Sequence, residues 1–307
     1  MQPTKTMYVH MRELKKYALD LRLTAVEKVH ERYVLLRLTH DEPLPTMLPG
    51  QFVEVRVDGS PTTFLRRPIS INFVDREKNE LWLLVATVGD GTRRLAQLQP
   101  GDTLNCVLPL GNGWSIMNNG QCTMYNAQCT MDNGQGTMDN GQGGMHDDEL
   151  RPLLIGGGVG VAPLLYLGAT LKEAGVEPTF LLGARTSKDL LMLDEFRRYG
   201  RVFVTTEDGS EGEKGFVTQH SLLQKERFTL IQTCGPTPMM KAVARFAKEN
   251  GVACEASLEN LMACGLGACL CCVEKVRVDA DASTTVATNV CVCKDGPVFD
   301  VRRLMWD

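Results

Sequence analysis

Short runs of leucine and β-branched residues, separated by turn residues, occupy the chain from about residue 20 to residue 110. The runs are LRLTAVEKV, YVLLRLTH, QFVEVRV, ISINFVD, LWLLVATV and TLNCVLPL. Tight turns are expected at Pro49-Gly50 and at Pro100-Gly101-Asp102. Because runs of this length and spacing are typical of a small antiparallel barrel, the sequence predicts a β-barrel over residues 20–113.

From Arg151 the pattern changes to strands that alternate with helices. The segment PLLIGGGVGVAPLLYLGATLKEAG reads as a hydrophobic strand, a glycine-rich turn and an amphipathic helix, and further strands are expected at 178–185, 201–210 and 229–240. This alternation predicts a Rossmann-like α/β domain over residues 150–250. Residues 251–307 then form a third, small domain, so the fold class is multi-domain α+β.

Between these regions, residues 118–145 break both patterns. They read NNGQCTM, YNAQCTM, DNGQGTM and DNGQGGM, four copies of one heptamer. Each copy has one dependable apolar position and several glycines, so no helical seam can form. We expect residues 114–149 to be a flexible linker that carries this insertion. Its Cys122 and Cys129 lack the neighbours that would close a metal site.

Composition changes this picture little. Hydrophobic residues make up 43% and charged residues 23%, as in an ordinary soluble protein, and the net charge of -4 argues against nucleic acid as a partner. The N-terminus lacks the apolar core of a signal peptide, and glycines and a proline interrupt the most apolar segment, residues 153–169. The sequence therefore predicts a cytoplasmic protein with reduced thiols and no membrane contact.

A cysteine-rich stretch near the C-terminus carries the strongest chemical signal. Four residues separate Cys264 from Cys269, two separate Cys269 from Cys272, and Cys293 follows further along. This is the plant-type ferredoxin spacing for a [2Fe-2S] cluster. The small residues at 265, 267 and 268 suit a backbone that wraps closely around the cluster.

The cysteine pattern has two other readings. A Cys-x-x-Cys pair is also half of a zinc site, and eleven cysteines raise the question of disulfides. Zinc sites rarely use the four-then-two spacing, however, and no secretory context supports disulfides. Cys271 would point away from the irons. Cys291 competes with Cys293 for the fourth position, and Cys293 is preferred because the Lys-Asp-Gly turn after it can aim it back.

Within the predicted barrel, Arg66-Arg67-Pro68-Ile69-Ser70 is a candidate flavin motif. A guanidinium can bind a diphosphate bidentately, and a hydroxyl three residues later could reach a flavin ring nitrogen. The tetrapeptide Arg67-Pro-Ile-Ser70 alone is weak evidence, and a structural arginine at the start of a strand would explain it better. The turn from Val88 to Thr92 strengthens the flavin interpretation. The free N–H groups of this turn and its threonine hydroxyl suit a second contact to phosphate.

In the α/β region, two glycine-rich segments follow strands. The first contains Gly157, Gly158 and Gly160 ahead of the predicted helix, where backbone N–H groups can face a pyrophosphate. The second contains Cys234 and Gly235 at the carboxyl end of a strand, where open α/β sheets bind ligands. Cys234 is either a packed thiol at the strand end or a contact to the nicotinamide, and the sequence leaves both readings open.

Together with the ending VCKDGPVF, these motifs resemble those of class 1B dihydroorotate dehydrogenase electron transfer subunits, over residues 20–302. These belong to the ferredoxin reductase superfamily. The heptamer insertion and the N-terminal lead of about twenty residues depart from the family. The resemblance implies that FAD is held by Arg67, Pro68, Ile69, Ser70, Leu84, Val85, Ala86, Gly91 and Thr92. It also implies that the cluster ligands are Cys264, Cys269, Cys272 and Cys293.

The resemblance further implies a heterotetramer, two copies of this chain with two of an FMN-containing catalytic subunit that oxidises dihydroorotate in pyrimidine biosynthesis. Nicotinamide exchanges a hydride whereas an iron-sulfur cluster passes single electrons, so a flavin must stand between them. Electrons would pass from the partner's FMN through the cluster and FAD to NAD. No catalytic residue is expected in this chain.

Two other functions fit the same motifs. One is the small subunit of another NAD(P)H:ferredoxin-type oxidoreductase or of a hydrogenase diaphorase. Arg185 and Lys188 could pair with a 2′-phosphate, so the charge pattern leaves NADP open. The other is a redox sensor without turnover, which would have no need for the nucleotide site.

Overall fold

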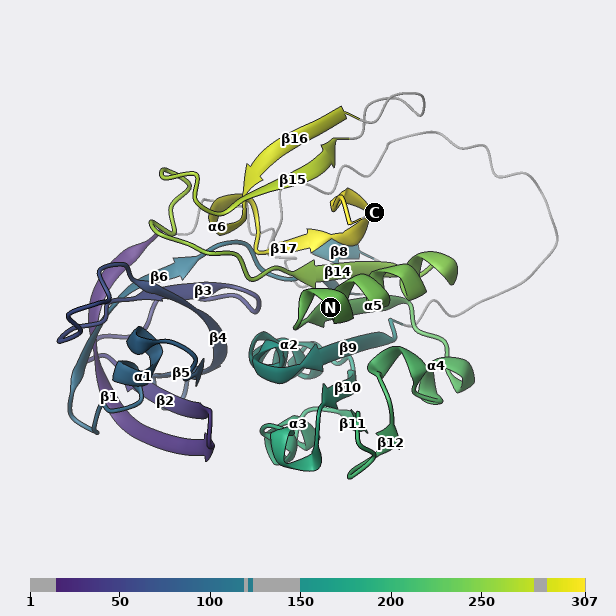
Figure 1. Cartoon of the computed structure of the whole chain (residues 1–307), viewed down its shortest axis with the longest axis horizontal. Coiled ribbons are helices and arrows are strands. Elements are labelled where there is room, and N and C mark those ends of the chain that lie inside the picture. Colours follow the sequence, from purple (N-terminus) through teal and green to yellow (C-terminus); the bar gives the residue numbers. More distant parts are fainter. Residues whose placement is uncertain (1–14, 119–120, 124–149, 279–285, 307) are drawn as a thin grey trace, which may run out of the picture.

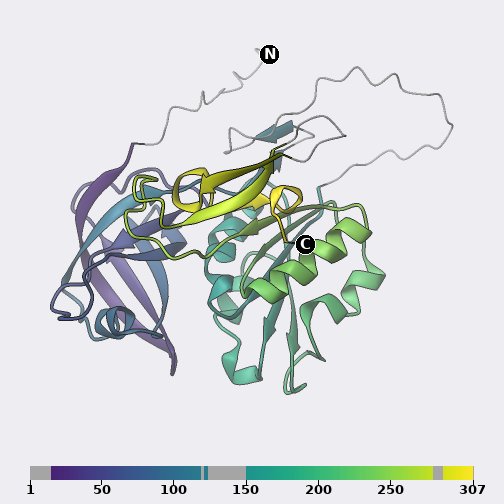
Figure 2. The same cartoon turned by 45° about the horizontal axis from the view of Figure 1, so that its top comes forward.

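The computed structural model describes residues 15–118, 121–123, 150–278 and 286–306. A closed barrel lies beside a seven-stranded sheet, and the C-terminal hairpin lies over the junction between them (Figure 1 and Figure 2). The predicted fold class is confirmed.

Six antiparallel strands close the barrel in the order β1-β2-β5-β4-β3-β6. They are β1 (Tyr17–His30), β2 (Tyr33–Thr39), β3 (Phe52–Val55), β4 (Arg67–Asp75), β5 (Glu80–Ala86) and β6 (Thr103–Leu110). Side chains such as Leu21, Leu36 and Ile71 are fully buried in its interior. A short helix, α1 (Asp90–Leu95), connects β5 to β6.

The second sheet has the order β12-β11-β10-β9-β13-β14-β17. Its strands are β9 (Pro152–Gly157), β10 (Thr179–Ala184), β11 (Arg201–Thr206), β12 (Glu213–Lys214), β13 (Leu230–Cys234), β14 (Ala253–Ser257) and β17 (Val298–Asp300). All pairs are parallel except β14 with β17. Every residue of β9 and β13 is buried, as expected for central strands of a parallel sheet that helices cover on both faces.

Four helices cover this sheet. Those on one face are α2 (Ala162–Glu173) and α3 (Leu193–Arg197), and those on the other are α4 (Leu222–Lys225) and α5 (Thr237–Glu249). Helix α2 is not the amphipathic helix that the sequence predicted, because nine of its twelve residues are buried. It is enclosed between the sheet, where Leu164 shares a core with Phe180, and the barrel, whose core Tyr166 enters. A helix covered on both sides is apolar all round.

Polar contacts also join the barrel to the α/β sheet. The Asn72 side chain on β4 donates a hydrogen bond to the Ala162 carbonyl at the start of α2, at 2.9 Å. The Tyr166 hydroxyl, one turn along, donates to the Met47 carbonyl at 3.0 Å. Both hydrogen bonds are buried, so they fix how the two parts lie against each other.

The C-terminal segment shares its packing with both neighbours. It contributes β14 and β17 to the sheet, and the hairpin of β15 (Val273–Val278) and β16 (Val286–Cys291) leads into the short helix α6 (Val292–Asp295). Its buried side chains form one core with Phe52 and Leu110 of the barrel. The boundary at residue 250 between the predicted NAD-binding and cluster domains therefore falls between β13 and β14. These two strands are hydrogen-bonded to each other in one sheet.

At the start of the linker, β7 (Ile116–Asn118) pairs with β8 (Gln121–Thr123). The expected flexibility of the heptamer repeat concerns residues that lie almost entirely outside the described ones. Over the described ranges, no helix is both long enough and apolar enough to cross a membrane.

Candidate functional site

The structure brings the two predicted flavin motifs together. Arg67 begins β4, and Gly91 and Thr92 lie in the first turn of α1. A Cβ atom on Gly91 would lie only 3.1 Å from Nε of Arg67, so glycine leaves the guanidinium room beside the turn. The Thr92 hydroxyl accepts a hydrogen bond from the Gly89 N–H at 3.1 Å, which holds the turn closed. Ser70 is half-buried further along β4 and lies opposite Phe52.

Two of the other expected flavin contacts, Leu84 and Val85, can act only through the main chain. Leu84 and Val85 are buried in the protein core, and Ala86 ends β5. Two large apolar side chains beside the motifs are nevertheless uncovered, since Phe64 is 90% exposed and Val88 is 78% exposed. An apolar surface of this kind next to a guanidinium suits a ligand that has both a flat ring and a diphosphate. The barrel therefore fits FAD.

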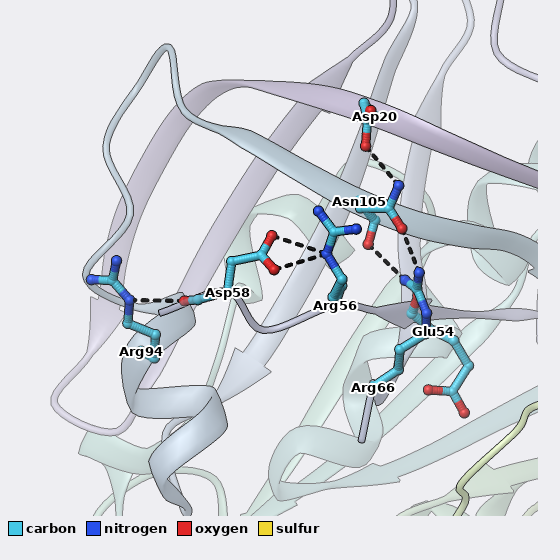
Figure 3. A network of polar contacts seen from close by, with 7 residues as sticks. All are labelled: Asp20, Glu54, Arg56, Asp58, Arg66, Arg94 and Asn105. Carbon is cyan, nitrogen blue, oxygen red and sulfur yellow. Dashed lines mark hydrogen bonds and ion pairs between the residues drawn. The ribbon is translucent and has the colours of Figure 1, made fainter. Parts of the chain in front are cut away.

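Arg66, the neighbour of Arg67, ties barrel strands together (Figure 3). Its guanidinium donates to the carbonyls of Glu54 on β3 and Asn105 on β6, at 3.2 and 3.0 Å, and to the Asn105 side chain. Asn105 in turn donates to Asp20 on β1 at 2.6 Å. Arg66 is thus the structural arginine of the pair, whereas the Arg67 guanidinium donates to the nearby carbonyls of Leu65 and Arg66, at 3.3 and 3.2 Å, and does not tie strands together.

The Glu54 side chain is the unusual member of this network. It is completely buried, and its carboxylate points away from the guanidinium of Arg66 (Figure 3). Neither oxygen has a hydrogen-bond partner in the part of the chain that the structure describes. Burial raises the pKa of Glu54 to about 7, although Arg66 opposes the shift. The carboxylate adjoins the cysteine loop, because a Cβ atom on Gly265 would lie 2.7 Å from its Cγ.

The two predicted nucleotide segments also meet. A Cβ atom on Gly160 would lie 2.4 Å from Cα of Gly235 and 2.5 Å from the carbonyl oxygen of Cys234, so the loop after β9 rests directly on the turn after β13. Gly157 and Gly158 line a cavity of about 580 Å³ beside this contact. The Cys234 thiol does not line it, since the side chain is fully buried in the core under α2. Its position is that of a packed thiol at a strand end.

Pro236, Pro238 and Met239, which continue the predicted turn after β13, line the cavity from the start of α5. Sequence reasoning missed the other walls. Arg32 and Tyr33 reach the cavity from the barrel, and Glu207 and Phe216 also line it. The signal that was available for Glu207 is its position directly after a parallel strand, where open sheets place ligand contacts.

The four expected cluster ligands lie together in two pairs. The Cys264 side chain neighbours that of Cys269, and the Cys293 side chain neighbours that of Cys272. Over the described ranges, no three Cys, His, Asp or Glu side chains converge on a single ion position. Two thiol pairs are what a cluster with two irons needs, because each iron takes two protein ligands. The donor set therefore fits [2Fe-2S].

Backbone N–H groups point at these sulfurs. Leu266 donates to the Cys264 sulfur at 3.3 Å and Gly267 donates to the Cys293 sulfur at 3.1 Å. Burial alone would raise the pKa of Cys264, but the N–H groups around the sulfur outweigh it and lower that pKa to about 6. These N–H groups favour the thiolate form of Cys264.

Cys291 is placed differently from Cys293. Its thiol donates a hydrogen bond to the Gly267 carbonyl at 3.8 Å. A carbonyl oxygen beside the sulfur disfavours a thiolate, whereas the Gly267 N–H that points at Cys293 favours one, and this contrast supports Cys293 as the fourth ligand. Cys271 is exposed, but so is the expected ligand Cys269, so exposure does not separate the two.

Two family models match the chain. The iron-sulfur cluster binding domain of dihydroorotate dehydrogenase B matches residues 259–305, and an oxidoreductase NAD-binding domain matches residues 154–245. The predicted iron-sulfur and NAD-binding domains are thereby confirmed.

Among solved structures, an NADH-dependent reduced ferredoxin-NADP oxidoreductase, described for flavin-based electron bifurcation, aligns with a TM-score of 0.73 and 30% identity over 94% of this chain and 90% of that one. The cytochrome b5 reductase domain of Ulva prolifera nitrate reductase aligns with a TM-score of 0.55 over 76% of this chain and 94% of that one, at 17% identity, and shows the fold alone.

Curated relatives extend over most of the chain. The electron transfer subunit of dihydroorotate dehydrogenase B (NAD(+)) from Fusobacterium nucleatum subsp. nucleatum is 35% identical over 255 residues, which cover 82% of this chain and 84% of the relative. The subunit of the same name from Shouchella clausii is 37% identical over 258 residues, covering 84% and 86%. At this identity and coverage, the chain belongs to the family of dihydroorotate dehydrogenase B electron transfer subunits.

Proposed function

We propose that this chain carries electrons between a dihydroorotate-oxidising catalytic subunit and NAD, in pyrimidine biosynthesis. The observation that supports this most directly is the contact between the cysteine loop and the barrel. Gly265 packs against Glu54 on β3 and Leu110 on β6, and β3 pairs directly with the flavin strand β4. A cluster in the loop and a flavin on the strand would therefore be close neighbours.

Each group has a distinct task in this proposal. FAD supplies the chemistry that links single-electron transfer at the cluster to hydride transfer at nicotinamide. Arg67 binds its diphosphate, the Ser70 hydroxyl orients its ring, and the main chain of Leu84, Val85 and Ala86 lines its site beside Gly91 and Thr92. The N–H groups of Gly157, Gly158 and Gly160 face the pyrophosphate of NAD, and Gly235 keeps that loop in place.

The cluster is held by Cys264, Cys269, Cys272 and Cys293. The N–H groups of Leu266 and Gly267 stabilise negative charge on the sulfurs. This favours the reduced state of the cluster and so raises the cluster's reduction potential. The nine cysteines whose side chains the structure describes are free, which suits the reducing cytoplasm, where we place the protein.

For the partner, we propose an FMN-containing dihydroorotate dehydrogenase subunit, with two copies of each chain in the complex. Support comes from the relatives, which are electron transfer subunits by name and so require a catalytic subunit.

The test is dihydroorotate-dependent reduction of NAD by this chain, purified together with the FMN-type subunit from the same source. Activity that requires both chains, with FAD and iron in this one, is expected. A matched control replaces Cys272 with serine, which should abolish the activity while FAD stays bound. Failure of a cofactor-loaded pair to reduce NAD, when this chain alone still oxidises NADH with a dye, would rule out the proposed donor.

A second candidate is the small subunit of another ferredoxin-type oxidoreductase. The solved structure with a TM-score of 0.73 favours it, because that protein is a reduced ferredoxin-NADP oxidoreductase. Reduction of this chain by reduced ferredoxin, with no response to the dihydroorotate dehydrogenase subunit, would select this candidate.

A further inference from the structure

A methionine sulfur forms part of the wall of the nucleotide cavity. Met239 lies in the first turn of α5, is only partly buried and lines the cavity. Its neighbour Met240 is 2% exposed and belongs to the core that contains Cys272 and Cys293. These two adjacent methionines therefore differ in their access to small molecules, because only Met239 borders the cavity.

The end of the Met239 side chain packs against both glycine segments of the nucleotide site. A Cβ atom on Gly157 would lie 2.7 Å from the Met239 sulfur, and a Cβ atom on Gly235 would lie 2.8 Å from its Cε methyl group. Each glycine thus brings the main chain into contact with the thioether. Since even a carbon atom would be too close at Gly157, no room remains for an oxygen atom between the sulfur and this loop.

The main chain on either side of this contact is held in place. Pro236 and Pro238 flank the start of α5, and the Met240 N–H donates to the Pro236 carbonyl at 3.1 Å, which closes the first turn. Gly157 ends β9, whose residues are all buried. An atom added to the sulfur must therefore either displace the loop after β9 or occupy space in the cavity.

From these observations we infer that Met239 is a modification site, where oxidation of the thioether to the sulfoxide weakens nucleotide binding. Hydrogen peroxide is the oxidant. One peroxide oxygen is transferred to the sulfur, the O–O bond breaks and water leaves, so the sulfur loses two electrons and the peroxide gains them. This adds a regulation to the proposed function, and it rests on the cavity being the NAD site.

The sulfoxide oxygen explains the loss of affinity. Oxidation converts an apolar thioether into a polar group that carries negative charge on its oxygen. Turned toward Gly157, this oxygen would push the nucleotide loop away from the turn after β13. Turned into the cavity, it would face the proposed position of the NAD pyrophosphate, which is itself negative. Both orientations oppose binding of the nucleotide.

The test treats the chain, loaded with FAD and its cluster, with hydrogen peroxide. The KM for NADH is then measured with a dye that takes electrons from FAD, so that damage to the cluster does not enter the measurement. Peptide mass spectrometry should find the sulfoxide at Met239 and not at the buried Met240. The KM should rise about tenfold, with a much smaller change in kcat.

Met239→Leu separates this effect from other oxidative damage, since leucine has a similar volume and no sulfur. This variant should have a KM within about twofold of the untreated wild type and should keep it after peroxide treatment. Met305→Leu is the matched control. Met305 is 38% exposed and lies outside the cavity lining, so its variant should lose affinity for NADH as the wild type does.

Oxidation of Met239 without a rise in KM would overturn the inference, and so would a rise that Met239→Leu does not prevent. The same holds if Met239 stays reduced at a peroxide concentration that oxidises Met305. An untreated chain that does not oxidise NADH at all would contradict the proposed function, and the inference with it. An untreated chain that oxidises NADH and does not respond to peroxide would contradict the inference alone.

Discussion

Single residues decide which sulfurs hold the cluster. The Cys293 sulfur accepts a hydrogen bond from the Gly267 N–H, whereas the Cys291 thiol donates to the carbonyl of the same glycine. We predict that Cys293→Ser removes the cluster and that Cys291→Ser leaves it in place. Iron analysis and the visible absorption of the two purified variants check this. A chain that keeps its iron without Cys293 and loses it without Cys291 would reverse the assignment.

The buried Glu54 carboxyl predicts how stability depends on pH. Its pKa is about 7 in the folded chain and 4.5 in a model peptide, so between these values the folded chain holds a proton that the unfolded chain has lost. The contribution of Glu54 to the free energy of unfolding is therefore largest below about pH 4.5 and falls as pH rises toward 7. The loss is on the order of 3 kcal/mol.

Replacing Glu54 by glutamine removes this titration. We expect Glu54→Gln to flatten the fall in the urea midpoint of unfolding between pH 5 and pH 8 in the cofactor-loaded chain. Glu77→Gln is the control, because Glu77 is exposed on the same barrel and should retain the wild-type profile. An unchanged slope in Glu54→Gln would show that the carboxyl is not the source of the pH dependence.

At the scale of elements, the nucleotide loop after β9 tolerates little added volume. A methyl group on Gly160 would meet backbone atoms of Gly235 and Cys234, whereas one on Gly157 would first meet the flexible end of Met239, at 2.7 Å. We therefore predict that Gly160→Ala destabilises the chain by about 3 kcal/mol and Gly157→Ala by about 1 kcal/mol. Urea unfolding of the two variants measures the difference. Equal losses would mean that the backbone contact yields as easily as a side chain.

Elements were predictable where local chemistry determines them. The barrel runs, the strand before the glycine loop and the cysteine spacing each specify a structure through residues close in sequence. The burial of α2 on both sides could not be predicted in this way. The barrel covers its second side, and the barrel is built from residues far from α2 in the sequence. Ligand walls from distant segments, such as Tyr33 and Phe216, were missed for the same reason. Contacts between segments far apart in sequence leave no local pattern.

At the scale of the whole molecule, hydride transfer requires the barrel and the α/β sheet to hold one mutual orientation. Asn72 lies on β4, the strand of the flavin motif, and its partner Ala162 begins the helix that follows the nucleotide loop. Their hydrogen bond thus connects the two ligand sites directly. The bond from Tyr166 to Met47 also joins the two parts, but it lies one turn farther from the loop.

This difference leads to a prediction about rate. Both Asn72→Ala and Tyr166→Phe should lower stability by about 1 kcal/mol, since each removes one buried hydrogen bond. Only Asn72→Ala should slow reduction of the flavin by NADH, by about tenfold, because small misplacements of reacting groups are costly. Stopped-flow absorbance at saturating NADH measures this step without the partner subunit. If both variants slowed it equally, general loosening of the interface would explain the effect, and if neither did, the Asn72 hydrogen bond would have no part in aligning the two sites.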